Sequence, residues 1–220
     1  MAKQSTLIKA CEKCKKRPAD SLINKLCSIC YRRIYFEQLP EENKITEWMT
    51  VIPQRFINAT VEDLVDSVRK SLLNESNETG VFLWGPPGVG KSYALCAAAK
   101  KFISNGLLCK RMSYELLCLK LRDTFKPSSI ESEWGIIEPL INCDRLFLED
   151  IGTTKSIDSK ESDFSLRTLL VIVDLRIEHC KPTFISSNKS LENLAKSFDD
   201  RIGDRLKLYK IIKMEGKSKR

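Results

Sequence analysis

The sequence predicts an α/β domain, in which helices flank a parallel sheet, preceded by a small cysteine-rich module. Three observations lead to this prediction. Four short apolar segments, at 81–84, 107–112, 145–149 and 182–186, alternate with segments of helical periodicity, which is typical of parallel strands joined by helical crossovers. A glycine-rich loop separates the first strand from the helix that follows it. Two cysteine pairs near the N-terminus predict a separate small unit.

Size and composition limit the classes of protein to consider. The chain has 220 residues, which is enough for one sizeable domain and a small appendage. No segment approaches the roughly 18 apolar residues that span a bilayer, and the N-terminus has no apolar run typical of a signal peptide. We therefore expect a cytoplasmic protein with no membrane partner.

The chain is basic, with 37 Lys and Arg against 29 Asp and Glu and a net charge of +8. Such a charge is compatible with nucleic-acid binding, because basic side chains release counterions from phosphates. It is equally compatible with an ordinary solvated surface. Two basic clusters, at 13–17 and 210–220, favour an acidic partner only slightly.

Cys11, Cys14, Cys27 and Cys30 follow the pattern C-x2-C-x12-C-x2-C. This spacing predicts a structural zinc site, because two tight turns supply four thiolates and leave no coordination position open. Metal binding would provide the folding free energy of so short a segment, on the order of 10 kcal/mol. Four unliganded thiols or a redox pair are the alternatives. The other cysteines lie in apolar segments and are expected to be small buried side chains: Cys96, Cys109, Cys118, Cys143 and Cys180.

These features divide the chain into three parts. We assign residues 1–36 to a zinc-binding module, which ends in a segment with apolar residues at helical spacing. Pro40 and the polar stretch "EENK" predict a connector at 37–49. Residues 50–220 would form the large domain, with a basic C-terminal tail.

The stretch "GPPGVGKS" fits the phosphate-binding pattern G-x-x-x-x-G-K-[ST] and stands between a predicted strand and a predicted helix. Glycines let backbone N–H groups turn toward phosphates, and the helix N-terminus adds its positive dipole end. Lys91 is expected to reach the β- and γ-phosphates, and the Ser92 hydroxyl to bind magnesium. The predicted nucleotide contacts are Gly85, Pro86, Pro87, Gly88, Val89, Gly90, Lys91, Ser92 and Tyr93.

Polar residues end two of the other predicted strands. Glu149 and Asp150 follow an apolar strand, and carboxylates at that edge of a parallel sheet face the ligand. Asn188 follows the next strand, where an amide can orient the attacking water. Arg201 and Arg205 stand four residues apart on one predicted helix. They are read either as arginine fingers for a neighbouring subunit or as members of surface ion pairs.

With these four elements in order, residues 50–210 resemble the AAA+ ATPases of the DnaC/DnaI helicase-loader family, also called IstB/DnaC-type ATPases. The stretch "IPQRFINATVEDL" is similar to the family's opening segment, which helps shape the adenine pocket. "LRTLLVIVDLRIEHCKPTFISSN" is similar to the segment that ends at sensor 1, here Asn188, and "DRIGDRL" to the one that carries the arginine finger. The resemblance implies a P-loop NTPase fold of AAA+ type, with Arg205 slightly favoured as the finger.

The resemblance also implies a function. The protein would bind ATP with Mg²⁺, contact a replicative DNA helicase through its zinc module, and help place that helicase on single-stranded DNA. ATP would act as a switch, and ATP-bound subunits would associate through the ATPase domain.

One feature departs from the family pattern, which has Asp and then Glu before "IG". Here Glu149 takes the magnesium position and Asp150 the catalytic one. Because aspartate is one methylene shorter and catalysis is sensitive to displacements near 1 Å, we expect slow ATP hydrolysis with intact binding.

Three other functions are considered. A transposition helper of the IstB type would share the ATPase core and act with a transposase on duplex DNA. A zinc-containing nucleoside kinase would also combine a phosphate loop with four cysteines, although thymidine kinases carry them after the loop. An adaptor that holds ATP without hydrolysing it is compatible with the inverted acids.

Overall fold

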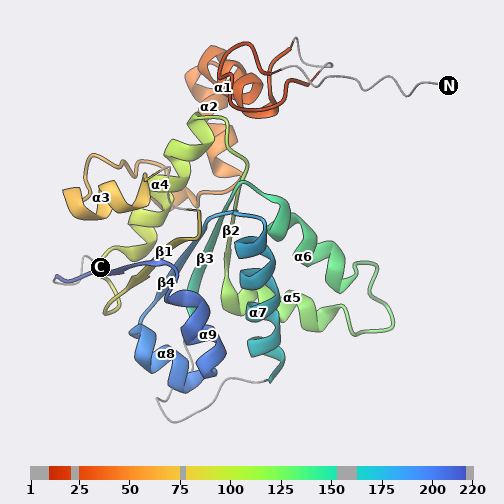
Figure 1. The fold of residues 1–220 in the computed structure, drawn as a ribbon, viewed down its shortest axis with the longest axis vertical. Coiled ribbons are helices and arrows are strands. Elements are labelled where there is room, and N and C mark those ends of the chain that lie inside the picture. Colours follow the sequence, from red (N-terminus) through yellow and green to blue (C-terminus); the bar gives the residue numbers. More distant parts are fainter. Residues whose placement is uncertain (1–9, 21–24, 75–77, 153–162, 217–220) are drawn as a thin grey trace.

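A parallel sheet forms the centre of the protein, which we describe from a computed structural model (Figure 1). The structure describes residues 10–20, 25–74, 78–152 and 163–216. Five strands in the order β2-β3-β4-β1-β5 form this sheet, and every neighbouring pair is parallel. They are β1 (Gly80–Trp84), β2 (Cys109–Ser113), β3 (Arg145–Ile151), β4 (Thr183–Ser187) and β5 (Lys210–Lys213).

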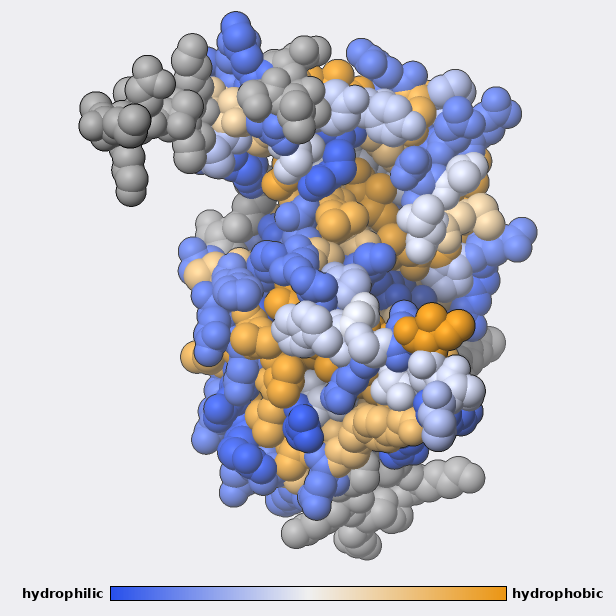
Figure 2. Space-filling model, turned by 90° about the vertical axis from the view of Figure 1, so that its right-hand side faces the viewer, coloured by the Kyte–Doolittle hydropathy of each residue, from blue (hydrophilic) through white to orange (hydrophobic). Residues whose placement is uncertain are grey.

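Helices cover both faces of the sheet. The helices of the described residues are α1 (Ser28–Gln38), α2 (Glu41–Met49), α3 (Asp66–Leu72), α4 (Lys91–Ser104), α5 (Tyr114–Asp123), α6 (Glu133–Asn142), α7 (Asp163–Glu178), α8 (Leu191–Ser197) and α9 (Asp200–Leu206), with a short 3₁₀ turn at Gln54–Phe56. Of these, α1 and α2 lie above the sheet in Figure 1 and pack against α4. On the side of the molecule that carries α5 and α6, hydrophobic groups are separated by hydrophilic ones (Figure 2).

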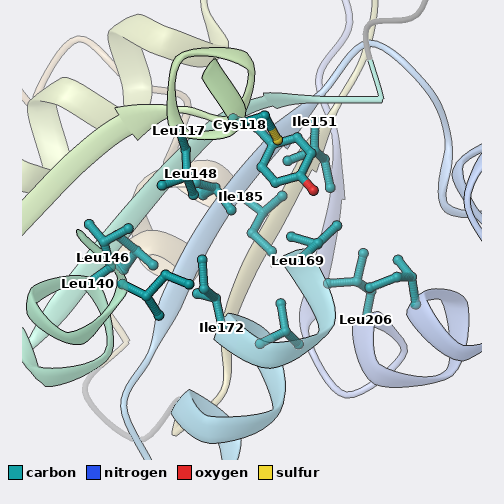
Figure 3. Close-up of a cluster of buried hydrophobic side chains, with 14 of the residues drawn as sticks. Leu117, Cys118, Leu140, Leu146, Leu148, Ile151, Leu169, Ile172, Ile185 and Leu206 are labelled. Carbon is teal, nitrogen blue, oxygen red and sulfur yellow. The ribbon is translucent and has the colours of Figure 1, made fainter. Parts of the chain in front are cut away.

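Alternation of side chains along the strands builds two cores. On one face, Leu146, Leu148 and Ile185 pack with residues of α5, α6, α7 and α9 (Figure 3). On the other face, Phe147 and Phe184 stack with their ring centroids 4.9 Å apart and pack with α3 and α4. Successive residues of a strand point to opposite faces, so a continuous apolar run is expected of a strand that is covered on both sides.

The four predicted strands are present, and the bounds of each differ from the prediction by no more than two residues. The fifth strand was not predicted. Residues 210–213 had been assigned to a basic tail, but they pair with β1 in parallel register, from Val81 opposite Lys210 to Trp84 opposite Lys213. A mostly exposed edge strand with lysine at both ends has little apolar signal, which explains why its sequence resembles a tail.

The predicted connector contains helix α2, which packs against α4. The Trp48 ring lies 5.7 Å from that of Phe36 and donates a hydrogen bond to Ser104 Oγ at 3.2 Å. The Lys100 ammonium lies 4.2 Å above the Trp48 ring. Residues 37–49 therefore include a packed helix, and the division into module, connector and domain stays a prediction.

Helix α1 packs against the C-terminal end of α4. Gly106 follows α4 with φ +81°, and a Cβ there would lie 2.3 Å from the carbonyl oxygen of Ile29. Arg32 donates hydrogen bonds to Gly106 O at 2.7 Å and to Asp144 Oδ2 at 2.9 Å. The cysteine-rich segment is therefore held against the helix that begins at the phosphate-binding loop.

Two further expectations can be compared with the structure. Four of the five scattered cysteines are buried as predicted, but Cys180 is exposed. It lies just after α7 with φ +49°, where the chain turns back toward β4. Among the described residues, no helix is long and apolar enough to cross a membrane.

Candidate nucleotide-binding site

The glycine-rich loop connects the C-terminal end of β1 to the first turn of α4. Its first glycine is required by the surrounding backbone, because Gly85 has φ +154° and a Cβ there would lie 2.2 Å from the carbonyl oxygen of Met214. Met214 N in turn donates to Trp84 O at 2.7 Å. The segment after β5 therefore supports the start of the loop.

Lys91 and Asn188, predicted from separate motifs 97 residues apart, are in direct contact. Lys91 Nζ donates to Asn188 Oδ1 at 2.7 Å, and also to the carbonyl oxygens of Gly85 at 2.7 Å and Pro86 at 3.0 Å. The lysine side chain is buried although it is charged. A buried ammonium with three oxygen acceptors is well satisfied. Its position at a helix N-terminus suits an anion, and a phosphate that bound Lys91 would replace one or more of these acceptors.

The remaining predicted loop residues differ in exposure. Pro86 and Pro87 are exposed, Val89 is buried, and Gly88, Gly90, Ser92 and Tyr93 are half-buried. Ser92 lies in the first turn of α4, as a hydroxyl ligand of a nucleotide-bound metal would.

Tyr93 connects the loop to the segment that precedes α3. Its hydroxyl donates to the Asp63 carboxylate, and this hydrogen bond is the main reason why the pKa of Tyr93 is raised. The Tyr93 ring meets Phe56 edge-on at 6.4 Å. The stretch that the resemblance associates with the adenine pocket therefore contacts the helix that follows the loop.

Glu149 is held by an arginine that the sequence analysis did not single out. Arg111 Nε donates to one carboxylate oxygen at 2.7 Å and Arg111 Nη2 to the other at 2.8 Å. The two side chains are 17% and 3% exposed. Burial lowers the pKa of Arg111, but the hydrogen bonds and charge of Glu149 outweigh that effect and raise it. Both oxygens of the predicted magnesium ligand thus accept hydrogen bonds from Arg111, and the metal role of Glu149 stays a prediction.

Asp150 lies in an irregularity of β3. The register with β4 shifts between Leu148 and Ile151, and Asp150 has φ +56°, an unusual conformation for a residue other than glycine. Its backbone N–H donates to Ser186 Oγ at 3.1 Å. Among the described residues its carboxylate has no hydrogen bond or ion pair, so it is the acid at this strand end that is available to a ligand.

The two arginines of α9 pair with carboxylates outside the loop. Arg201 Nε donates to Asp199 Oδ1 at 3.0 Å, and Arg205 Nε to Asp174 Oδ1 on α7 at 2.9 Å. Arg201 also borders a surface hollow of about 610 Å³ along α7. Both arginines form ion pairs and are also partly exposed. These contacts are compatible with a surface ion pair and with an arginine finger alike.

The four predicted zinc ligands converge. Their sulfur atoms all lie within 4.8 Å of one another, and three of the four residues are buried. Tetrahedral zinc–thiolate sites have Zn–S distances of about 2.3 Å, which places the sulfurs about 3.8 Å apart. A hydrogen bond from the backbone of Cys14 is the main reason why the pKa of Cys11 is lowered to about 6, and this favours the thiolate that binds zinc. Burial instead raises the pKa of Cys30 to about 12, so that thiol would release its proton only on binding the metal. The cluster fits a zinc ion.

Arg111, Asp63 and Met214 were not predicted to support the site. An arginine within a strand suggests a solvent-facing position unless the register with the neighbouring strand is known. Asp63 lies inside the quoted opening segment, and its spacing from Tyr93 gives no local signal. Met214 could have been found only through the unpredicted strand β5.

Comparison with known proteins supports the AAA+ assignment. No family model matches the chain. The replicative helicase loader DnaC of Escherichia coli strain K12 is 26% identical over 134 residues, 61% of this chain and 52% of the relative, so the chain spans about half the length of the curated relatives it matches. A crystal structure of the DnaC helicase loader superposes with a TM-score of 0.60 and 19% identity, covering 74% of this chain and 99% of that one.

The structure of AMPPCP-bound DnaA from Aquifex aeolicus superposes with a TM-score of 0.60 and 17% identity, covering 72% of this chain and 50% of that one. At these identities the structural matches show a shared fold. Together with the sequence match, the strand order and the four-cysteine cluster, they lead to one conclusion. The chain has the P-loop fold of the AAA+ ATPases and resembles the replicative helicase loader DnaC in sequence.

Proposed function

We propose that this protein binds ATP at the loop around Lys91 and uses it as a switch while it helps place a replicative helicase on single-stranded DNA. The observation that carries the proposal is the hydrogen bond between Lys91 and Asn188. This contact supports the proposal that Lys91 binds phosphate and Asn188 senses the γ-phosphate, in a chain similar to DnaC.

Nucleotide would enter with Mg²⁺, and among the described residues Ser92 and Asp150 are polar groups near the loop whose side chains are free to face the metal side of the phosphates. Asn188 would orient the attacking water through its amide. Because Glu149 is tied to Arg111 and Asp150 is shorter than the usual glutamate, hydrolysis would be slow.

The zinc module would contact the helicase. The four cysteines fix a short segment whose own apolar core is small, and α1 connects it to α4 through Arg32. A partner bound at the module would thus contact a unit that is attached to the nucleotide-binding helix. The net charge of +8 is compatible with single-stranded DNA nearby.

Self-association would place an α9 arginine at a neighbour's nucleotide. Arg201 stands beside the hollow on α7 with a side chain that is 60% exposed. Arg205, which the resemblance favours, is 37% exposed and tied to Asp174. We propose both as candidates, and single alanine variants would separate them by the loss of ATP hydrolysis at constant nucleotide affinity.

A capture experiment tests the central claim. The full chain is immobilised, a purified replicative helicase is offered with ATP, ADP or no nucleotide, and the retained helicase and its transfer to single-stranded DNA are measured. We expect capture or transfer to depend on nucleotide and Lys91→Ala to remove that dependence. Lys101→Ala, an exposed lysine of the same helix, is the matched control. Identical behaviour with and without nucleotide would overturn the proposal.

A second candidate is an adaptor that binds ATP without hydrolysing it, which the occupied Glu149 carboxylate favours. It predicts nucleotide-dependent capture of the helicase with no turnover by the wild type, even with helicase and DNA present.

A further inference from the structure

The Arg111–Glu149 pair lies between two parallel strands, on the face of the sheet that α4 covers. Arg111 is opposite Phe147 in the register of β2 and β3, and Glu149 is two residues further along β3. Residues two apart in a strand share a face, and Phe147 packs in the core formed with α4. The ion pair is therefore on the same side of the sheet as the phosphate-binding loop.

Cys96 indicates which part of α4 lies over the ion pair. Charges of both Arg111 and Glu149 act on the thiol of Cys96, although burial is the main reason why the pKa of Cys96 is raised to about 12. Cys96 is four residues after Ser92, so the two share a face of α4. The pair thus lies beneath the first turns of the helix whose start holds the phosphates.

The geometry leaves Glu149 little capacity for a further ligand. A carboxylate has about four acceptor positions, and the fork of Arg111 uses two of them, one on each oxygen. The other positions have little access to solvent, since the side chain is only 3% exposed. Moving this carboxylate to a metal would leave a mostly buried guanidinium without its partner, which is unfavourable.

We propose that Arg111 is a positioning residue that keeps Glu149 in a structural ion pair, so that Asp150 and not Glu149 is the carboxylate that faces nucleotide-bound magnesium. This inference rests on the proposed function, because it assumes that a magnesium nucleotide occupies the loop. It moves the magnesium position from Glu149, where the family pattern places it, to Asp150, and gives Glu149 a structural role.

The test is the magnesium dependence of nucleotide binding. The dissociation constant of a fluorescent ADP analogue is measured with Mg²⁺ and with EDTA for the zinc-loaded full chain, in exposures brief enough to retain the zinc. The measured quantity is the dissociation constant in EDTA divided by that in Mg²⁺, which is larger when magnesium strengthens binding. We expect Glu149→Gln to change this ratio by less than about twofold, and Asp150→Asn to reduce it by about tenfold. Arg111→Met releases Glu149 from its ion pair, so this variant should have a higher ratio than the wild type. Adding Glu149→Gln to Arg111→Met should abolish that increase.

A second measurement needs no nucleotide. Thermal unfolding of Arg111→Met, Glu149→Gln and the double variant forms a cycle in which each single change leaves a partner group unsatisfied. We expect both single variants to unfold at lower temperature and the double variant to recover part of the loss. Asp204→Asn, which breaks an exposed pair with Lys207, should have little effect.

The outcomes separate this inference from the proposed function. If Glu149→Gln abolishes the magnesium dependence and Asp150→Asn does not, Glu149 is the metal-side acid and the inference is rejected. If the unfolding cycle shows additive effects, the ion pair is not structural and the inference is likewise rejected. If the wild type binds no nucleotide at all, the proposed function fails, and the cycle still decides the state of the pair.

Discussion

Replacing Arg32 by alanine tests the connection between the cysteine-rich segment and the α/β domain. Arg32 makes two contacts across this boundary, to Gly106 O and to Asp144 Oδ2. A hydrogen bond of this kind contributes about 1 kcal/mol net, and a partly exposed ion pair about 0.5–1 kcal/mol. Asp144 keeps a second partner, since Leu108 N donates to it at 2.7 Å. We therefore expect Arg32→Ala to reduce the free energy of unfolding by about 1.5–2 kcal/mol.

The adjacent Arg33 supplies a matched control. It pairs with Glu37 within α1, and both side chains are about half exposed, so Arg33→Ala should reduce the free energy of unfolding by about 0.3–0.5 kcal/mol. Urea unfolding at saturating zinc, followed by tryptophan fluorescence, measures both values, and Trp48 lies at the contact between α2 and α4. Equal effects of the two substitutions would show that Arg32 does not hold the module to the domain.

Three further predictions concern the loop, the cluster and the sensor. Gly85→Ala should destabilise the fold by about 1–3 kcal/mol and weaken nucleotide binding, because the new Cβ would lie 2.2 Å from Met214 O. Calorimetric unfolding and nucleotide titration measure these effects, and an unchanged stability would contradict the loop geometry. Removing zinc with a chelator should expose the backbone around the cysteines to hydrogen exchange while the strands stay protected. The metal should be lost more readily at lower pH because protons compete for the thiolates. Uniform exchange across the chain would contradict a separate metal-held unit. Asn188→Ala should lower ATP hydrolysis by at least about tenfold and change nucleotide affinity little, which steady-state turnover and binding assays compare; a parallel loss of affinity would mean that Asn188 acts by holding Lys91.

The parts of the site that lie within one motif could be predicted from the sequence. The glycine loop is defined by its spacing and by the apolar strand before it, and β1 begins within one residue of the prediction. The contact of Lys91 with Asn188 joins residues far apart in the chain, but it follows from the rule that strand ends of a parallel sheet meet at one edge. Their roles in hydrolysis stay predictions.

The parts that depend on strand register could not be predicted. The partner of Glu149 is known only once β2 lies beside β3 and places Arg111 on the same face. The strand β5 has two lysines and two isoleucines, and its stability comes from pairing with β1 and not from its own pattern. The helix α2 did leave a local signal, because Glu41 and Glu42 in its first turn suit the positive end of a helix, but Pro40 and the polar stretch suggested a connector.

Helix α4 connects the two halves of the proposed mechanism. It has 14 residues, or about 21 Å at 1.5 Å per residue, and its first residue is Lys91, the residue proposed to bind phosphate. Near its other end Ser104 accepts a hydrogen bond from Trp48, and the Gly106 carbonyl accepts one from Arg32. Because a packed helix of this length moves as one body, a nucleotide that shifts the start of α4 also shifts the surface on which the module rests. The Arg32→Ala variant should therefore still bind nucleotide, but nucleotide should no longer affect its capture of the helicase. Loss of nucleotide binding as well would mean that the Arg32 contact is needed for α4 to fold.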